Sequence, residues 1–511
     1  MNSSKHLRVS ALAFLLVCAL AAPPLRAQTA NENLASDVER LVLLYRLSDS
    51  KVGVVALDLR TGTEIVARNA TEALIPASNA KLLTTAAALD CLGADFEFVT
   101  TLYRTGPING DGVIEGDLVV KGAGDPNISG RFFDGNVCAV FEKWAGNLRK
   151  LGVKRIGGDI VLDDTIFDRE FVHPAWPDEQ LAGWYCAPVS ALVFNDSCVD
   201  ITVKASAVLD APAQVVLAPP TEYVTIKNKV TTTSKKAAHS IALNRKPGAN
   251  TIEIRGEFWQ KADALVESVT VENPTMYFGA VLRETLARQG IECAGRVRCA
   301  DAPFDAAQAG VEAVARSRSS LAATIEVANK RSQNLYAEQL LKRMGWQKHG
   351  TGSFANGSKV VGEFLEGLDC GKDNFSISDG SGLSRLNRAS AEHLVGVLRW
   401  ALGEEARAEI MRNSLSVSGV DGTLAKRMTD PLRKGRVLGK TGYISGVSTL
   451  SGYVLDANGS PAVAFSVLIN WRNPKSAPKP FQDSFCGLLV SWVDRNPRTQ
   501  EPTPGGESEG K

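Results

Sequence analysis

Residues 76–89 read Pro-Ala-Ser-Asn-Ala-Lys-Leu-Leu-Thr-Thr-Ala-Ala-Ala-Leu, and this stretch decides how the rest of the chain is interpreted. The apolar run predicts a helix that begins near Pro76 and ends before Gly93. Ser78 and Lys81 are three residues apart, so they share one face of its first turn. A serine hydroxyl is activated when a neighbouring base takes its proton, and lysine becomes such a base only where its pKa falls from about 10.4. By itself the same spacing also fits a capping serine beside a solvated lysine.

The composition is that of a soluble globular protein with enough residues for several domains. The chain has 511 residues, of which 44% are hydrophobic and 22% are charged. Its 57 basic and 56 acidic residues give a formal net charge of +1. A nearly neutral chain without a basic stripe is not typical of proteins that bind polyanions, so we expect no nucleic-acid partner.

The N-terminus has the pattern of a secretory signal peptide. Lys5 and Arg8 precede an apolar run at residues 11–22, and small residues follow as far as Ala27. This pattern predicts a signal peptide over residues 1–27 and export to the periplasm. A retained N-terminal anchor is the alternative, although the apolar run is short for a membrane span.

The cysteines favour disulfide bonds over metal binding. Nine cysteines, one of them in the predicted signal peptide, leave eight in the rest of the chain. An even count in an exported chain favours disulfides, and we expect Cys186 to pair with Cys198 and Cys293 with Cys299. Buried free thiols are the alternative. No Cys-x-x-Cys spacing occurs, so we expect no metal site, and no cofactor is implied.

The chain changes character along its length. Residues 28–97 predict a helix, a β-hairpin and then the serine-bearing helix, whereas residues 98–310 are β-rich, with a smaller subdomain at about 205–265. Residues 311–495 return to helices and then give two strands, a hairpin turn between them and a last helix. Residues 496–511 are rich in Pro, Gly and Glu and are predicted to be a disordered tail.

A second short motif, Ser332-x-Asn334, lies between two predicted helices. The hydroxyl of Ser332 could pass a proton from Lys81 to a leaving amine, and the amide of Asn334 could bond both Lys81 and a substrate amide. Ser332 follows Ser78 by 332 − 78 = 254 residues, and the β-rich region fills that interval. This arrangement predicts a domain inserted into another domain.

A third motif, Lys440-Thr441-Gly442, leads into a predicted strand. The ammonium of Lys440 and the hydroxyl of Thr441 suit a substrate carboxylate, and Gly442 lets a ligand backbone approach closely. We also expect Lys440 to lie near Lys81 and to lower the pKa of Lys81 by charge repulsion.

The three motifs, in this order, resemble those of class C, type-four low-molecular-mass penicillin-binding proteins, the D-alanyl-D-alanine carboxypeptidase/endopeptidase family. Gly-Ala-Gly-Asp-Pro at 122–126 and Asp-Gly-Ser-Gly-Leu-Ser-Arg at 379–385 add to the resemblance. It implies an α/β (α+β) fold, in which a transpeptidase-like domain has an antiparallel sheet flanked by helices. It also implies that residues 28–97 and 311–495 form this domain, with the β-rich domain inserted between the first and second motifs.

The resemblance implies acyl transfer from peptidoglycan stem peptides. Ser78 would attack the penultimate D-Ala carbonyl, D-Ala would leave, and water would hydrolyse the ester; β-lactam antibiotics would acylate the same serine as inhibitors. The backbone N–H groups of Ser78 and Tyr443 would stabilise the oxyanion. Cleavage of D-Ala-diaminopimelate cross-links and peripheral association with the membrane or cell wall fit the same resemblance.

The resemblance also assigns a pocket for the stem-peptide side chain. Arg385 and Ser445 match positions that line this pocket in the family, and Asp163 and Phe167 of the inserted region are expected to reach it. For Arg385, an ion pair that orders its own loop is the alternative.

Two other functions and one other catalytic assignment remain open. A β-lactamase has similar motifs, and a non-catalytic sensor or scaffold could bind penicillin or muropeptides without turnover. The long insertion argues against the first, and the complete set of reactive side chains argues against the second. A Ser-His-Asp triad is a weaker rival, because none of the five histidines lies in a recognisable motif.

Overall fold

The computed structural model describes residues 25–368, 370 and 374–497. The predicted signal peptide (1–27) and the predicted tail (496–511) lie almost entirely outside these residues. Within the described ranges, no helix combines the length and the apolar character that crossing a membrane would require.

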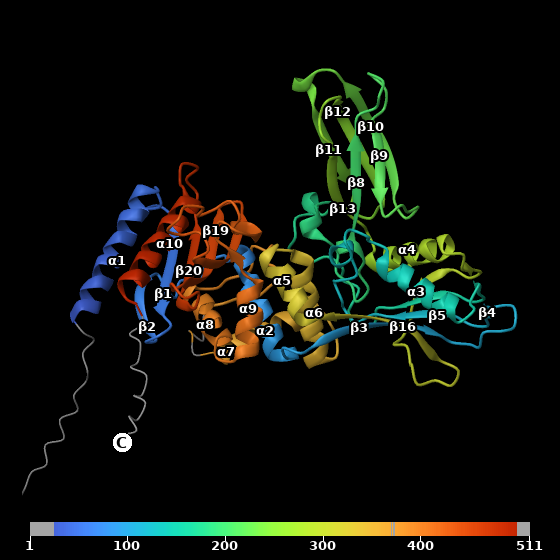
Figure 1. Ribbon diagram of the computed structural model, residues 1–511, viewed down its shortest axis with the longest axis horizontal. Helices are drawn as coiled ribbons and strands as arrows, with labels where there is room; N and C mark the ends of the chain where they lie inside the picture. Colours follow the sequence, from blue (N-terminus) through green and yellow to red (C-terminus); the bar gives the residue numbers. More distant parts are fainter. Residues whose placement is uncertain (1–24, 369, 371–373, 498–511) are drawn as a thin grey trace, which may run out of the picture.

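A six-stranded antiparallel sheet forms the centre of one half of the molecule (Figure 1). In spatial order its strands are β17 (Ser416–Val417), β18 (Val437–Ile444), β19 (Val447–Leu455), β20 (Pro461–Asn470), β1 (Lys51–Asp58) and β2 (Thr63–Arg68). The hairpin predicted near the N-terminus is β1–β2, and it pairs with the last strand of the chain, β20. Segments from both ends of the sequence therefore build one sheet.

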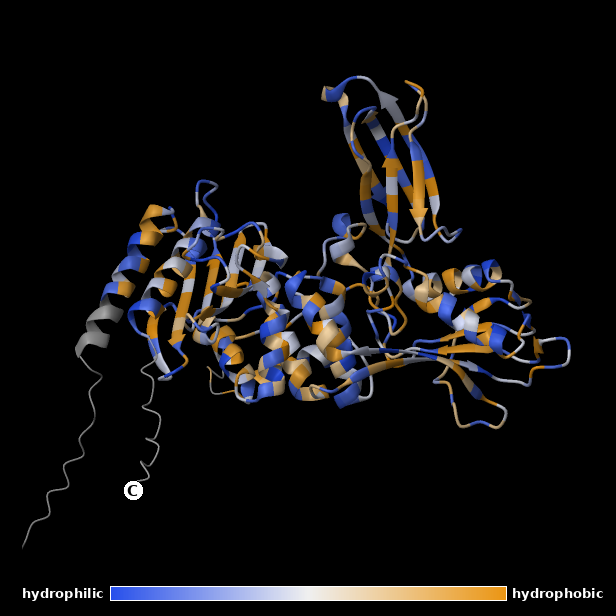
Figure 2. Cartoon of the chain, in the orientation of Figure 1, coloured by the Kyte–Doolittle hydropathy of each residue, from blue (hydrophilic) through white to orange (hydrophobic). Residues whose placement is uncertain are grey.

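Helices cover both faces of this sheet. Helices α1 (Leu25–Leu44) and α10 (Pro478–Arg495) pack on one face, and α8 (Ala391–Ala401) packs on the other. Strands β19 and β20 are buried almost throughout, because neither of their faces meets solvent. This double coverage explains the nearly continuous apolar sequence of β20, whereas β19 also buries Ser448, Thr449 and Ser451. Orange strands of this sheet are visible in Figure 2.

A helical layer next to the sheet carries the first two motifs. Its central helix is α2 (Ala80–Leu92), which Gly93 ends as predicted. Around it lie α5 (Leu321–Lys330), α6 (Asn334–His349), α7 (Phe354–Glu366) and, against α5, α9 (Glu405–Ser414). The helices bring segments before and after the β-rich region into one core.

The chain leaves and re-enters this half through two paired strands, β3 (Glu97–Arg104) and β16 (Glu312–Ser320). They continue into a five-stranded sheet with β15 (Val297–Cys299), β7 (Ile160–Asp163) and β5 (Leu118–Lys121). Helices α3 (Ala139–Lys150) and α4 (Pro274–Arg288) pack on this sheet. Beside them is a small sheet of β4 (Val113–Ile114), β6 (Arg155–Ile156) and β14 (Glu292–Cys293).

Two three-stranded sheets project from the second half of the molecule (Figure 1). One contains β8 (Cys198–Lys204), β9 (Gln214–Ala218) and β13 (Leu265–Thr270), and the other contains β10 (Thr225–Thr233), β11 (Ser240–Arg245) and β12 (Thr251–Trp259). The predicted fold class is therefore confirmed: an antiparallel sheet flanked by helices, with a large β-rich insertion between the first two motifs.

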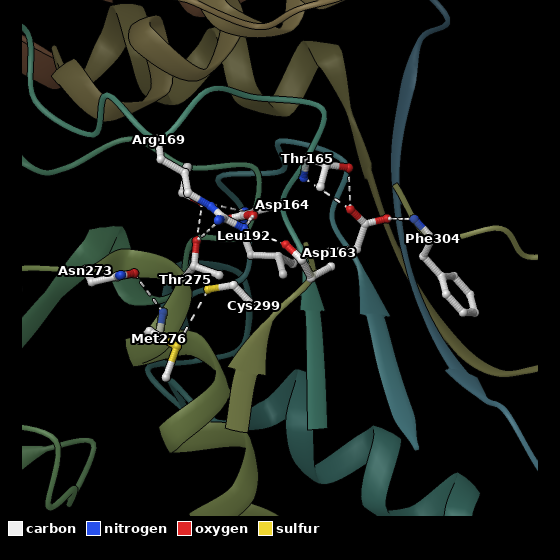
Figure 3. Close-up of polar contacts among 12 residues, drawn as sticks. Asp163, Asp164, Thr165, Arg169, Leu192, Asn273, Thr275, Met276, Cys299 and Phe304 are labelled. Atoms are coloured by element: carbon white, nitrogen blue, oxygen red, sulfur yellow. Dashed lines mark hydrogen bonds and ion pairs between the residues drawn. The ribbon is translucent and has the colours of Figure 1, made fainter. Parts of the chain in front are cut away.

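Both predicted disulfides are wrong. Cys186, Cys198, Cys293 and Cys299 are all free thiols. The Sγ atom of Cys293 lies 3.8 Å from the carbonyl oxygen of Gly158, whereas that of Cys299 lies on another strand and 3.7 Å from the Sδ atom of a methionine (Figure 3). Proximity in the sequence did not bring Cys293 and Cys299 together, because their thiols contact different parts of the insertion.

Candidate active site

Ser78 lies in a tight 3-10 turn, η1 (Ala77–Asn79), directly before α2. Ala77 has a φ of 45°, a left-handed conformation that alanine rarely adopts, so the turn is strained just before the serine. The Nζ atom of Lys81, one turn further on, lies 3.1 Å from the Oγ atom of Ser78. The nucleophile–base pair expected from the sequence is therefore in hydrogen-bond contact.

Lys81 is fully buried and is held by two further acceptors. Its Nζ atom lies 2.6 Å from Oδ1 of Asn334 and 2.8 Å from the carbonyl oxygen of Ser381. Burial lowers the pKa of Lys81 to about 7, although the carboxylates of Glu338 and Asp379 act in the opposite direction. A substantial fraction of Lys81 is therefore neutral near pH 7, as a general base requires.

Lys440 contacts the second motif. Its Nζ atom lies 2.8 Å from Oγ of Ser332, which occupies the loop between α5 and α6 with a φ of 59°. Burial, and then the charge of Lys81, hold the pKa of Lys440 well below its usual range. We expected the charge of Lys440 to contribute to the lowered pKa of Lys81. Burial lowers that pKa, and the repulsion between the two amines instead lowers the pKa of Lys440.

Asn334, the first residue of α6, connects the two halves of the molecule. Its Oδ1 atom accepts from Lys81, and its Nδ2 atom donates to the carbonyl oxygen of Tyr185 in the insertion at 2.7 Å. The bond to Lys81 was predicted. The amide nitrogen, which we expected to bind substrate, is bonded to Tyr185.

The third motif lies at the edge of the six-stranded sheet. Strand β17 pairs only with the residues before Lys440, so β18 is the edge strand from there on. A Cβ atom on Gly442 would lie 2.9 Å from the backbone nitrogen of Ser78 and 2.1 Å from Oγ1 of Thr449. Only glycine allows this close approach. The hydroxyl of Thr441 donates to Oγ1 of Thr423 at 2.8 Å.

These elements enclose a cleft of about 820 Å³. The predicted residues that line it are Ser78, Ser332, Asn334, Arg385, Tyr443 and Ser445. Lys81 and Lys440 are fully buried and are not among the lining residues. The insertion supplies an opposite wall through Pro177, Glu179, Gln180, Trp184 and Tyr185, which the sequence did not single out.

Arg385 and Ser445 meet at one end of this cleft. A guanidinium nitrogen of Arg385 donates to the backbone carbonyl of Ser445, so the contact is a hydrogen bond and not the alternative ion pair. Tyr443, with 60% of its surface exposed, stands beside them, and its ring centroid lies 6.2 Å from that of Trp471.

Asp163 and Phe167 do not line the cleft, contrary to our expectation. Figure 3 shows Asp163 within the insertion, where its carboxylate accepts from the hydroxyl of Thr165 at 2.5 Å and from the backbone of Phe304 at 3.0 Å. Phe167 is buried and packs over Gly124 and Gly352. Both side chains stabilise local structure.

Two carboxylates behind Lys81, those of Glu338 and Asp379, were not predicted from the sequence. Glu338 is fully buried on α6 and accepts from the backbone nitrogens of Gly380 and Ser381 at 2.9 and 2.8 Å. Asp379 accepts from the indole nitrogen of Trp176, in the insertion, at 2.8 Å. Glu338 follows Asn334 by four residues and so shares its helix face, which is the signal that could have identified it.

Among the described residues, no group of three or more His, Cys, Asp or Glu side chains could hold a metal ion.

Comparison with known proteins is consistent with this geometry. Residues 34–490 match the family model described as the D-Ala-D-Ala carboxypeptidase 3 (S13) family. The chain belongs to this family. A D-alanyl-D-alanine carboxypeptidase of Actinomadura sp. (strain R39) is 33% identical over 472 residues, which cover 90% of this chain and 85% of the relative. The predicted family and its activity, serine-type D-Ala-D-Ala carboxypeptidase, are thereby confirmed.

A relative of known structure supports the fold. Penicillin-binding protein 4 (dacB) from Haemophilus influenzae is 25% identical, with a TM-score of 0.75, and the match covers 89% of this chain and 99% of that chain. The same protein complexed with a novel β-lactam matches with a TM-score of 0.70. The Haemophilus influenzae carboxypeptidase DacB is 26% identical over 428 residues, covering 82% of this chain and 85% of the relative.

Proposed function

We propose that Ser78 is the nucleophile and Lys81 the general base of a serine D,D-peptidase that releases the terminal D-Ala of peptidoglycan stem peptides. The observation that supports this most strongly is the buried amine of Lys81, with a pKa lowered to about 7, at 3.1 Å from the hydroxyl of Ser78. A neutral amine at that distance can take the serine proton as the hydroxyl attacks the penultimate carbonyl.

Substrate orientation in this proposal depends on the edge of β18. The terminal carboxylate of the peptide lies at the Lys440–Thr441 end, and the peptide runs along the strand past Tyr443. The backbone N–H groups of Ser78 and Tyr443 stabilise the oxyanion, and losing one such donor typically costs on the order of 3 kcal/mol. The close approach of Gly442 to the Ser78 nitrogen supports this arrangement.

Ser332 is the proton donor that we assign to the leaving amine. Its hydroxyl lines the cleft and is held by Lys440 at 2.8 Å. Lys81 passes the proton that it took from Ser78 to Ser332, which restores the hydroxyl that protonated D-Ala. In the second step the neutral amine of Lys81 takes a proton from the attacking water and gives it to the oxygen of Ser78 as the acyl-serine ester breaks.

The proposed enzyme has inhibitors, a location, a domain organisation and a second substrate that follow from the same activity. β-Lactams acylate Ser78 as inhibitors, which the complex of the Haemophilus influenzae relative supports. The enzyme acts in the periplasm after cleavage of residues 1–27 and associates peripherally with the cell wall or membrane. Residues 28–97 and 311–495 form the catalytic domain, and 98–310 the insertion. D-Ala-diaminopimelate cross-links are a second substrate, through the same acyl-enzyme.

The test is a Ser78→Ala variant. We expect it to retain the fold, shown by an unchanged circular dichroism spectrum and melting temperature, but to lose both fluorescent-penicillin labelling and D-Ala release from a pentapeptide. Label that persists on the variant would contradict the assignment of the nucleophile.

The wild-type enzyme distinguishes the alternatives. Multiple turnovers of penicillin would indicate a β-lactamase, whereas binding of muropeptide without release of D-Ala would indicate a sensor. Digestion of purified sacculi, followed by identification of the fragments, separates carboxypeptidase from cross-link cleavage.

A further inference from the structure

The loop between α5 and α6 carries Ser332, and the insertion bonds the residues that follow it. Ser332 has a left-handed φ of 59°, which serine seldom adopts. The next residue, Gln333, is buried, and its Nε2 atom donates to Oδ2 of Asp196, in the insertion, at 2.7 Å. Asn334 is bonded to the insertion as well, through the carbonyl oxygen of Tyr185. These contacts support a backbone conformation that Ser332 would not favour alone.

The side chain of Gln333 depends on Asp196. Within the part of the chain that the structure describes, the bond to Asp196 is its only hydrogen bond, because Oε1 of Gln333 is buried without a partner. The backbone nitrogen of Gln333 lies 3.5 Å from the carbonyl oxygen of Val327, which is a long and weak bond. Without the carboxylate, the buried amide of Gln333 would lose its acceptor, and the loop would move to satisfy it.

Asp196 lies at the centre of a strained turn. Asn195, Asp196 and Ser197 have φ values of 47°, 54° and 54°, so three successive residues other than glycine are left-handed. Such a turn persists only where its surroundings fix it. The backbone nitrogen of Asn195 donates to the carbonyl oxygen of Ile128 at 3.0 Å. Arg131 forms an ion pair with Asp196, so the carboxylate is held in one place relative to the body of the insertion.

A second contact joins the same part of the insertion to α5. The Nδ2 atom of Asn127 donates to Oγ1 of Thr324 at 2.8 Å, and both residues are buried. Asn127 directly precedes Ile128, whose carbonyl oxygen holds the turn of Asp196. The insertion therefore contacts the helix before Ser332 and the residue after it, and the loop between them is held from both sides.

The conformation of this loop matters because the hydroxyl of Ser332 has to reach the leaving group. It lines the cleft and lies 2.8 Å from the Nζ atom of Lys440. A proton donor is effective only within hydrogen-bond reach of the atom that receives the proton, so a small displacement is costly. We propose that Asp196 is a positioning residue, which acts through Gln333 to hold the hydroxyl of Ser332 in the cleft. This assignment rests on the proposed function and adds a residue of the insertion to it.

The leaving group decides how strongly the reaction depends on Ser332. When a peptide acylates Ser78, the C–N bond breaks and the nitrogen takes a proton from Ser332 as D-Ala departs. In a thioester analogue the C–S bond breaks instead, and the sulfur keeps the electron pair. A thiol has a pKa of about 8.5, so the thiolate can leave without a proton. A displaced Ser332 therefore slows the reaction of the peptide and spares that of the thioester.

The kinetic test compares kcat/KM for a diacylated lysyl-D-Ala-D-Ala peptide and for its thioester analogue in an Asp196→Ala variant. We expect the ratio of peptide to thioester to fall about tenfold. Asp196→Asn should keep most of the ratio. Its one side-chain oxygen can replace Oδ2, which accepts from both Gln333 and Arg131, whereas Oδ1 has no partner among the described residues.

A Gln333→Ala variant tests the same link from the other side. We expect it to lower the ratio as Asp196→Ala does. Combining the two substitutions should add no further loss, because the two side chains act as one unit. If Asp196→Ala does not fold, Gln333→Ala and Asp196→Asn still give the two expected ratios.

The matched control is Asp159→Ala, which removes another aspartate of the insertion. Asp159 pairs with Arg298 at 2.8 Å and accepts from the backbone nitrogen of Arg296, so the partners of its carboxylate belong to the insertion itself. We expect this variant to melt at a lower temperature and to keep the wild-type ratio. A wild-type ratio in Gln333→Ala, or an equal loss for both substrates, would overturn the proposal.

A Ser332→Ala variant separates this proposal from the proposed function. We expect it to show the same preference for the thioester, at least as strongly as Asp196→Ala. If Ser332→Ala slows both substrates equally, Ser332 is not the proton donor, and the proposed function is wrong at that step together with the role of Asp196. If Ser332→Ala shows the preference and the folded Asp196→Ala does not, the proton donor stands and only the positioning role of Asp196 is wrong.

Discussion

Replacing Glu338 by glutamine is expected to move the acid limb of the pH–activity profile to lower pH. Glu338 and Lys81 hold Ser381 from two sides: the carboxylate accepts from its backbone nitrogen, and the ammonium donates to its carbonyl oxygen, both at 2.8 Å. Ionised Glu338 raises the pKa of Lys81, opposing the larger effect of burial. Burial also raises the pKa of Glu338, to about 8, whereas the two backbone N–H groups that donate to its carboxylate favour the ionised form. Glutamine has nearly the same shape and lacks the charge.

The sign of the shift follows from the role of Lys81 as a base. Activity requires its neutral amine, so it falls as the pH decreases through the pKa of Lys81, which is about 7. Removing a nearby negative charge destabilises the ammonium form and lowers that pKa further. Because burial leaves Glu338 partly protonated near neutral pH, we expect the acid limb to move to lower pH by less than about one unit.

The same substitution is expected to lower stability. Both carboxylate oxygens of Glu338 accept hydrogen bonds, one from the backbone N–H of Gly380 and one from that of Ser381. A glutamine has only one side-chain oxygen, so its amide NH2 group would face one of these two N–H donors. A buried donor without an acceptor costs about 1–3 kcal/mol, measurable as a decrease in the free energy of unfolding in urea.

The assay is kcat/KM for a short peptide, or the rate of acylation by a β-lactam, from pH 5 to 9. A matched control is Gln339→Met, which removes another buried hydrogen bond of α6, from Gln339 Nε2 to the carbonyl of Ser190 at 2.8 Å, without changing the charge near Lys81. If Glu338→Gln loses stability but its acid limb coincides with that of the wild type, the proposed electrostatic link is refuted.

Two further substitutions test the third motif. Lys440→Met should slow acylation about tenfold, because Ser332 loses its hydrogen-bond partner. The acid limb should stay within about 0.3 pH units of the wild type, because burial rather than Lys440 sets the pKa of Lys81. A larger displacement in stopped-flow acylation would show that repulsion by Lys440 also lowers the pKa of Lys81. Gly442→Ala should lower the free energy of unfolding by about 1–3 kcal/mol, because its Cβ atom would lie 2.1 Å from Oγ1 of Thr449. We also expect the rate of acylation to fall at least tenfold. An unaltered rate of acylation in the folded variant would contradict the requirement for glycine.

The parts of the site that the sequence could predict are local. Ser78 and Lys81 are three residues apart on a helical turn, so their contact follows from helix geometry alone. Strand β20 is a long apolar run, and the doubly covered sheet explains why. Each of these predictions depends on neighbours within a few residues.

Contacts between distant segments could not be predicted in this way. The wall formed by residues 177–185 depends on how the insertion packs against the helices, and no local pattern records that. The same is true of Cys293 and Cys299, whose separation in sequence says nothing about the direction of their Cβ atoms. The expectation that Asp163 reaches the cleft was wrong for a related reason. A carboxylate at the end of a buried strand can bind groups of the protein itself, as Asp163 does with Thr165 and Phe304, just as well as it can bind a ligand.

The insertion has a chemical consequence at the lysine as well as a structural one. The catalytic half provides Lys81, but Trp176 bonds Asp379 behind it, and the carbonyl of Tyr185 fixes the amide of Asn334 in front of it. Burial is the cause of the lowered pKa of Lys81, and these contacts position groups that surround the amine. The insertion therefore helps to hold the environment in which lysine acts as a base near neutral pH. Its two connecting strands, β3 and β16, adjoin α2 and α5, so the packing of the insertion is coupled directly to the helices that carry the serine and the second motif.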